Sequence, residues 1–211
     1  MQPSDIVVEG GETREMKVLR NVENLQQQVP EQFNYIEVAA ANRPGRGKDQ
    51  DPIKIVLLQE VARFNVLLKV VQNSFVELIA ALKGQTLVSE AMEEMIQNFF
   101  DNKVPKAWKF AYHSIKPLAS WIADLKDRIE FFRSWAFDST PLTYWLGGFT
   151  YPSGFTTALK QKTARAINQS IHKLKWEFTF TKNEVTQQPR DGAAYIRGVF
   201  IEGARWSEDE A

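Results

Sequence analysis

The chain has 211 residues, of which 44% are hydrophobic and 12% aromatic, so it can bury a sizeable core in one large or two small domains. Lysine plus arginine equals aspartate plus glutamate, at 26 each, so there is no net basic field, and we expect neither a nucleic acid nor a membrane as a partner. Cysteine is absent, which excludes disulfides, thiolate nucleophiles and cysteine-based metal sites.

The N-terminal quarter predicts two short helical segments and a linker. Residues 1–12 hold few apolar anchors and lack the layout of a signal peptide. After Thr13 apolar residues recur every three or four positions, which predicts a helix that ends at Pro30, and a second short segment follows from Phe33. Residues 42–52 are polar and rich in glycine and proline, which indicates the clearest boundary of the chain.

The next segment predicts a long helix that begins near Pro52 and stops at Gly84. Its apolar stripe has alternating spacings of four and three residues: Leu57, Val61, Phe64, Leu68, Val71, Phe75, Leu78 and Leu82. Such a stripe can form a coiled coil with a partner or pack inside its own domain. Further apolar residues, Val66 and Leu67 among them, widen the face beyond a two-helix seam and favour the second interpretation. No apolar run approaches the roughly 20 residues of a membrane span.

Three more helices and one short helical turn follow. Ser89 is a good N-cap for the first helix, Pro105 opens the short turn, and Pro117 opens the second helix. The helix after Pro117 places its aromatic residues on one side and its charges on the other until Pro141 breaks it. A last helix restarts at Pro152, where Ser153 is the expected N-cap.

In the following segment, apolar residues recur at every second position instead of every third or fourth. Trp176, Phe178 and Phe180 alternate with polar residues, which predicts a half-buried strand. A turn signal at 189–192 precedes a second predicted strand over 195–201. The predicted fold class is therefore α+β and mainly helical: a helical bundle with one long helix, followed by a few β-strands.

No segment carries a recognisable catalytic, cofactor or metal site. Residues 43–48 contain a Gly-Lys pair but lack the earlier glycine and the following serine or threonine of a phosphate loop. His113 and His172 have no ligand partners at metal spacing, and the carboxylate pair Asp124 and Asp127 is typical of a solvated helix face. The tryptophans could stack bases or sugars, but their helical spacing favours the core.

Two segments near the C-terminus combine glycines with large aromatic residues, which indicates a packed corner rather than a surface. They are Trp145-Leu-Gly-Gly-Phe149, continued to Phe155, and the segment 198–206. We expect aromatic residues of both segments to clamp the helical part to the first strands, with glycines that permit close backbone approach. The candidate structural or interface residues are Trp145, Gly147, Gly148, Phe149, Phe155, Gly203 and Trp206.

These segments, in this order, resemble the C-terminal region of dynein heavy chains, and those of the axonemal type most. Further matches are Gln59-Glu60 with Leu82-Lys-Gly84, Val104-Pro105 with Trp108, and Ser114-Ile-Lys-Pro-Leu118 with Trp121. The resemblance covers residues 13–206. It implies that 1–41 end the small helical part of the last AAA+ module, 42–52 form a linker, 53–170 form a helical subdomain, and 171–211 begin a small β-barrel. Because a barrel needs more strands, we expect this chain to be a fragment or to belong to a heavy chain whose end is unusually short.

The resemblance implies a non-catalytic module of an ATP-driven microtubule motor for ciliary or flagellar movement. The module packs on the AAA+ ring of the same heavy chain and tunes force and stepping. ATP and Mg²⁺ belong to the parent motor, whose ATP sites and microtubule contact lie outside this sequence, so the segment itself takes no cofactor. Dynein intermediate and light chains are the implied partners in the complex, and the cytoskeleton of the axoneme is the implied location. The alternative is a free-standing helical adaptor that binds a partner helix through the long stripe.

Overall fold

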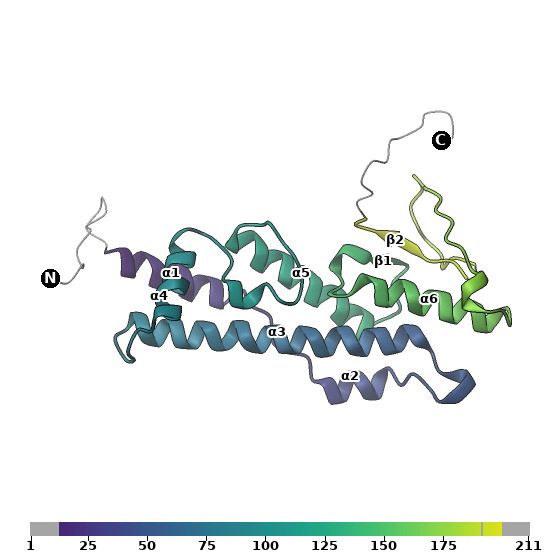
Figure 1. Cartoon of the computed structure of the whole chain (residues 1–211), viewed down its shortest axis with the longest axis horizontal. Helices are drawn as coiled ribbons and strands as arrows, with labels where there is room; N and C mark the ends of the chain where they lie inside the picture. Colours follow the sequence, from purple (N-terminus) through teal and green to yellow (C-terminus); the bar gives the residue numbers. More distant parts are fainter. Residues whose placement is uncertain (1–12, 191, 200–211) are drawn as a thin grey trace.

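The computed structural model describes residues 13–190 and 192–199, which form an elongated body built along one helix (Figure 1). Helix α3 runs along most of this body, with α1, α4, α5 and α6 on one side of it and α2 on the other (Figure 1). The helices in the described part of the chain are α1 (Arg14–Gln26), α2 (Tyr35–Ala41), α3 (Pro52–Leu82), α4 (Glu90–Phe100), α5 (Leu118–Phe137) and α6 (Pro152–Ala166). The strands there are β1 (Thr143–Trp145) and β2 (Tyr195–Arg197), so the predicted class, α+β and mainly helical, is confirmed.

Helix α3 begins and ends where its sequence predicts. The Asp51 side chain accepts a hydrogen bond from the backbone N–H of Ile53, and Pro52 occupies the first turn. Gly84 follows the last turn at a φ of +70°, a conformation that glycine adopts without a steric penalty. Local signals in the sequence therefore fix both ends of the longest element.

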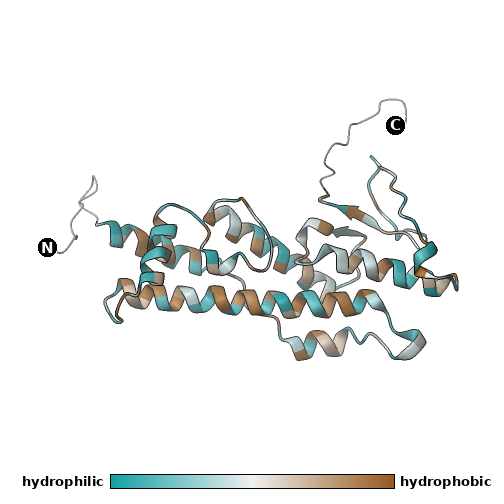
Figure 2. Cartoon of the chain, viewed as in Figure 1, coloured by the Kyte–Doolittle hydropathy of each residue, from teal (hydrophilic) through white to brown (hydrophobic). Residues whose placement is uncertain are grey.

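The apolar stripe of α3 lies inside the domain. Seven of its eight residues, from Leu57 to Leu78, are fully buried, and Leu82 is half-buried against the same core. Apolar residues recur along the whole helix (Figure 2). The stripe is therefore not available to a partner helix, and the adaptor hypothesis, which required a free stripe, is wrong on this point.

The same apolar content lets α3 pass a length and composition test for a membrane span, with a mean hydropathy of 1.3 over its most apolar window. A core helix of a soluble protein passes that test equally well. The buried stripe accounts for the apolar content of α3, because these residues form the centre of the core.

A single buried cluster connects the helices. It extends from Val18 in α1 through α3 and α5 to Ala158 in α6, and includes Trp108 and Trp121. The core assignment of these two tryptophans is therefore confirmed, because both indoles are buried. The domain boundaries predicted at 41, 52 and 170 stay predictions.

The β part differs from the predicted one. Strand β2 pairs in parallel with β1, Thr143 opposite Tyr195, although no alternation in the sequence indicated β1. The strand predicted over 176–180 is wrong: the backbone there forms no ladder, and the side chains of Trp176, Phe178 and Phe180 are exposed. Alternating apolar residues stabilise a strand only where a neighbouring strand takes up the backbone hydrogen bonds, and the described residues supply none at this place.

Candidate functional site

The aromatic corner lies where α5 meets β1 and the start of α6. Phe149 and Phe155 are buried with ring centroids 5.1 Å apart. Phe149 also packs edge-to-face on Phe132 of α5 at 5.2 Å, and Phe155 contacts Tyr144 of β1 at 4.5 Å. Such ring pairs contribute about 0.5–1.5 kcal/mol each beyond the burial of their area. The ring contacts of the corner thus join three successive elements, α5, β1 and the start of α6.

The predicted glycines of the corner make room for the indole of Trp145. A Cβ atom on Gly148 would lie 2.8 Å from ring atoms of Trp145, and a Cβ atom on Gly147 would lie 2.8 Å from the carbonyl oxygen of Gly198. Gly198 itself was not among the predicted residues. It has a φ of +73°, and a Cβ there would lie 2.6 Å from Trp145. Three glycines from two distant segments therefore surround one side chain.

Trp145 also lies between two arginines. The Arg128 guanidinium of α5 is 5.3 Å from its ring centre, and that of Arg197 in β2 is 5.2 Å from it. These cation–π contacts connect the helical part to the second strand through Trp145. The other two predicted residues, Gly203 and Trp206, lie outside the described residues, so the part of the clamp that they would form stays a prediction.

A charged cluster beside the corner was not anticipated. Asp124 is buried and accepts hydrogen bonds from Lys116 (2.5 Å) and Arg128 (2.7 Å), whereas Asp127 is exposed. The interpretation of both carboxylates as a solvated pair is therefore wrong for Asp124, because α5 turns it towards Arg128. Burial alone would raise the pKa of Asp124, but the hydrogen bonds and charges of Lys116 and Arg128 hold it below its usual range.

A second buried carboxylate connects α3 to the start of α6. Glu60 is fully buried and accepts hydrogen bonds from the backbone N–H (2.6 Å) and the hydroxyl (2.8 Å) of Thr150 and from the N–H of Tyr151 (3.0 Å). Arg63 donates to the same carboxylate at 3.0 Å. A carboxylate at a helix N-terminus also meets the positive end of the helix dipole. Glu60 therefore caps the N-terminus of α6. The predicted N-cap, Ser153, does not do so, because it lies inside the helix.

The sequence contained a signal for Glu60. Its position follows Leu57 by three residues and precedes Phe64 by four, so it falls on the buried face of the helix period. A charged residue at a core position implies a partner in the interior. The partners could not be named, because the loop that supplies them is 90 residues further along the chain.

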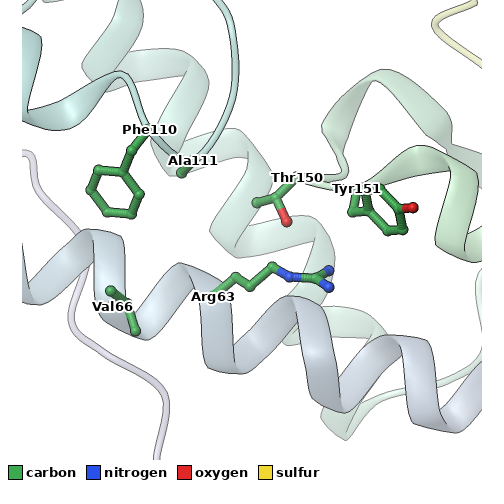
Figure 3. A pocket seen from close by; sticks show the side chains of 6 residues that line it. All are labelled: Arg63, Val66, Phe110, Ala111, Thr150 and Tyr151. Carbon is green, nitrogen blue, oxygen red and sulfur yellow. The ribbon is translucent and has the colours of Figure 1, made fainter.

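Next to Glu60 the surface forms a small pocket of about 340 Å³ (Figure 3). Its walls come from α3, from the loop after the short turn Lys106–Trp108, and from the start of α6. The lining residues are Arg63, Val66, Phe110, Ala111, Thr150 and Tyr151. Among the described residues no group of three His, Asp or Glu side chains could hold a metal ion.

Comparison with known proteins identifies the family. The family model of the C-terminal domain of the dynein heavy chain matches residues 1–211. The sequence is 39% identical over 201 residues to dynein axonemal heavy chain 2 of Mus musculus, and this alignment includes 93% of the present chain. It is 40% identical over 199 residues to the dynein-1-beta heavy chain of the flagellar inner arm I1 complex of Chlamydomonas reinhardtii, again with 93% of the present chain aligned. The chain spans about 4% of the length of these relatives.

The match covers the whole sequence, and it includes both glycine-rich and aromatic segments on which the resemblance depended. The helical body with its aromatic corner and buried carboxylates is thus the described part of one family domain. The chain belongs to the family of C-terminal domains of dynein heavy chains.

Proposed function

We propose that this chain is the non-catalytic C-terminal module of an axonemal dynein heavy chain, which packs on the AAA+ ring of that heavy chain and tunes force and stepping. Family membership supports the motor context, since the relatives named above are axonemal or flagellar heavy chains. The location that this membership favours is the ciliary or flagellar axoneme.

The continuous buried core of the described body supports the tuning role. A docked module biases the ring only through contacts that differ between the ring's conformations, and a soft module would absorb such differences. Here one buried cluster runs from α1 to α6, and the aromatic corner fastens its far end. This continuous core is the observation that carries the proposal.

The remaining parts of the motor lie outside this segment. ATP and Mg²⁺ belong to the AAA+ modules of the parent heavy chain, and the microtubule contact belongs to another part of it. Dynein intermediate and light chains are the further partners that we propose for the complex. No residue of this segment is assigned to catalysis.

The test is Gly148→Val in the full heavy chain. The added side chain would collide with the Trp145 ring, since a Cβ alone lies 2.8 Å from it, and would loosen the corner. We expect a changed stall force or run length in single-motor assays, with the microtubule affinity near that of the wild type. Ala123→Val, an exposed change on α5, is the matched control and should leave motility unchanged. A variant with an altered corner but wild-type motility in every parameter would contradict the tuning role.

A further inference from the structure

A second pocket, of about 600 Å³, lies at the segment that connects α4 to α5, and its walls are mostly cationic. Four lysines line this pocket, which we call the lysine pocket, and Asp101 is the only carboxylate among its lining residues. The lysines are Lys103, Lys106, Lys109 and Lys116. The whole chain carries equal numbers of basic and acidic residues, so this excess of cations is local.

Neighbouring carboxylates balance the charge of the lysine pocket only in part. Three of its lysines have an ion pair, whereas Lys109 has none within the described part of the chain. The pairs are Lys103 with Asp101 at 3.1 Å, Lys106 with Glu94 at 2.8 Å and Lys116 with Asp124 at 2.5 Å. Asp124 also pairs with Arg128, so three carboxylates face five cations. Ion pairs between exposed side chains are weak, so these lysines can turn to an anion of higher charge.

The backbone around the lysine pocket is anchored to the core, while the lysine side chains are exposed. Val104 and Trp108 lie between the lysines in the sequence and are buried, and the Trp108 indole donates a hydrogen bond to the hydroxyl of Ser74 in α3 at 3.1 Å. The carbonyl oxygen of Asn102 accepts from the N–H of Leu118 at 2.9 Å, which joins the two sides of the pocket. An anion that enters therefore meets cations whose backbone positions are already fixed.

Ser114 is the one lining residue of this pocket that carries a hydroxyl group. It lies in the segment 113–117, which forms neither helix nor strand and whose other residues are all exposed. Its hydroxyl oxygen accepts a hydrogen bond from the backbone N–H of Lys116 at 3.2 Å. The hydroxyl thus stands among the lysines on a stretch of backbone that a modifying enzyme can reach.

We infer that Ser114 is a phosphorylation site and that the lysine pocket receives its phosphate. A protein kinase transfers the γ-phosphoryl group of ATP to Ser114. The bond between Oγ and phosphorus forms, the bond from that phosphorus to the bridging oxygen of the departing ADP breaks, and the hydroxyl proton goes to a base of the kinase. The phosphate adds a charge of about −1.5 to −2 and three acceptor oxygens. Lys109, which lacks a carboxylate partner, is the first cation that it engages.

The modification changes both the contacts and the charge of the surface between α4 and α5. It adds a charged contact between the two sides of the pocket, which the hydrogen bond from Leu118 to Asn102 already joins at the backbone. Three carboxylates against five cations leave an excess that is close to the charge of one phosphate. Phosphorylation of Ser114 therefore switches a basic surface to a neutral one.

The first test uses the 211-residue chain with phosphoserine incorporated at position 114 or, as a matched control, at position 139. Ser139 is also accessible and outside a helix, but its neighbour is the exposed carboxylate Asp138. The second pKa of a phosphoserine is about 6, and cations nearby lower it because they stabilise the doubly charged form. In a titration followed by phosphorus NMR we expect this pKa to be lower at 114 than at 139 by about 0.5 or more. Equal pKa values at the two positions would overturn the inference.

Removal of lysine charges tests whether the lysine pocket is the receiver. Lys106→Gln combined with Lys109→Gln should raise the pKa of phosphoserine 114 towards that of phosphoserine 139, because two of the cations are lost. Lys175→Gln combined with Lys182→Gln removes the same charge from two exposed lysines that follow α6 and should leave the pKa at 114 unchanged. The same pKa in both double variants would show that the pocket does not hold the phosphate.

The modification itself is tested on the native heavy chain, purified from its axonemes with phosphatase inhibitors present. Mass spectrometry should find a peptide that is phosphorylated at Ser114, and treatment with a phosphatase before the measurement should remove that peptide. Ser114 without phosphate in heavy chains from both beating and arrested axonemes would overturn its assignment as a phosphorylation site.

Discussion

At the scale of single residues, the molecule is defined by two buried carboxylates with different partners. Asp124 is neutralised by two cations, Lys116 and Arg128. Glu60 has one cation, Arg63, and otherwise accepts from a backbone turn at the start of α6. A buried charge is tolerated only where its hydrogen bonds are satisfied, so each carboxylate specifies the position of the segment that satisfies it.

Removal of the Glu60 carboxylate should destabilise the domain. Glu60→Ala leaves the N–H groups of Thr150 and Tyr151 without their acceptor, and we expect a loss of about 2–4 kcal/mol in the free energy of unfolding. Glu60→Gln keeps one acceptor oxygen and should lose less. Urea unfolding measures the free energy of unfolding of both Glu60 variants. Glu77→Ala, on the exposed face of the same helix, is the control. Equal stability of Glu60→Ala and the control would show that the turn at 150–151 does not depend on Glu60.

Asp124 should make the stability depend on pH in the acid range. Its pKa in the folded protein lies below the ordinary value near 3.8, so its contribution is present above that value and is lost as the pH falls through the folded pKa. We expect Asp124→Asn to be about 1–2 kcal/mol less stable than the wild type at pH 7. The difference in stability between Asp124→Asn and the wild type should become smaller below a pH of about 4. Urea unfolding at a series of pH values measures this difference.

The control for this prediction is Asp127→Asn, which removes the same charge from an exposed position of the same helix. It should stay within about 0.5 kcal/mol of the wild type at pH 7. A difference between Asp124→Asn and the wild type that does not change with pH would contradict the ion-pair explanation.

At the scale of elements, α3 organises the fold because each of the other helices in the described part of the chain contacts it. The stripe from Leu57 to Leu78 gives α3 a buried face along its length. Phe75 lies at the centre of an aromatic group, 5.5 Å from both Phe99 of α4 and Trp108. The helix is therefore held by packing far more than by its own helical propensity.

Truncation within the stripe should be costly. Leu68→Ala and Phe75→Ala each remove a fully buried side chain and leave a cavity, so we expect losses of about 2–5 kcal/mol. Val76→Ala, on the exposed face of the same helix, should stay within about 0.5 kcal/mol of the wild type. Thermal melting compares the three variants. Unchanged melting of both core variants would mean that the stripe is solvent-exposed in solution, which would revive the adaptor hypothesis.

At the scale of the whole molecule, the described part is a helical body with its short sheet at one end (Figure 1). The aromatic corner and the Glu60 turn both lie where this end meets α3 and α5. Buried contacts therefore join the part of the body that carries the sheet to α3 and α5.

The isolated protein should neither bind nor hydrolyse ATP. Residues 43–48 lack the spacing of glycines and the hydroxyl residue with which a phosphate loop holds the phosphates and Mg²⁺. Calorimetric titration with Mg-ATP should give no heat of specific binding. A micromolar dissociation constant would contradict this prediction and would place a nucleotide site within the segment.

The elements whose signals are local could be predicted from the amino-acid sequence. The ends of α3 follow from Asp51, Pro52 and Gly84, and the N-cap of α4 follows from Ser89, whose hydroxyl accepts from the N–H of Met92. The face of α3 that is buried follows from the helical period of its apolar residues. The family follows from the order of its motifs, which the match over the whole sequence confirmed.

Features that depend on contacts between distant segments became apparent only in the folded protein. Asp124 and Asp127 look alike in the sequence. The spacing of four residues offers Arg128 to Asp124, but only the structure shows that Asp124 is buried and also pairs with Lys116. Strand β1 exists because β2, some fifty residues later, lies beside it, whereas the alternating segment 176–180 has no such neighbour among the described residues and stays exposed. Glu60 became a cap for α6 for the same reason. Hydrogen bonds and ion pairs need a partner in space, and the spacing of residues along a sequence encodes such a partner only when it lies within a few residues.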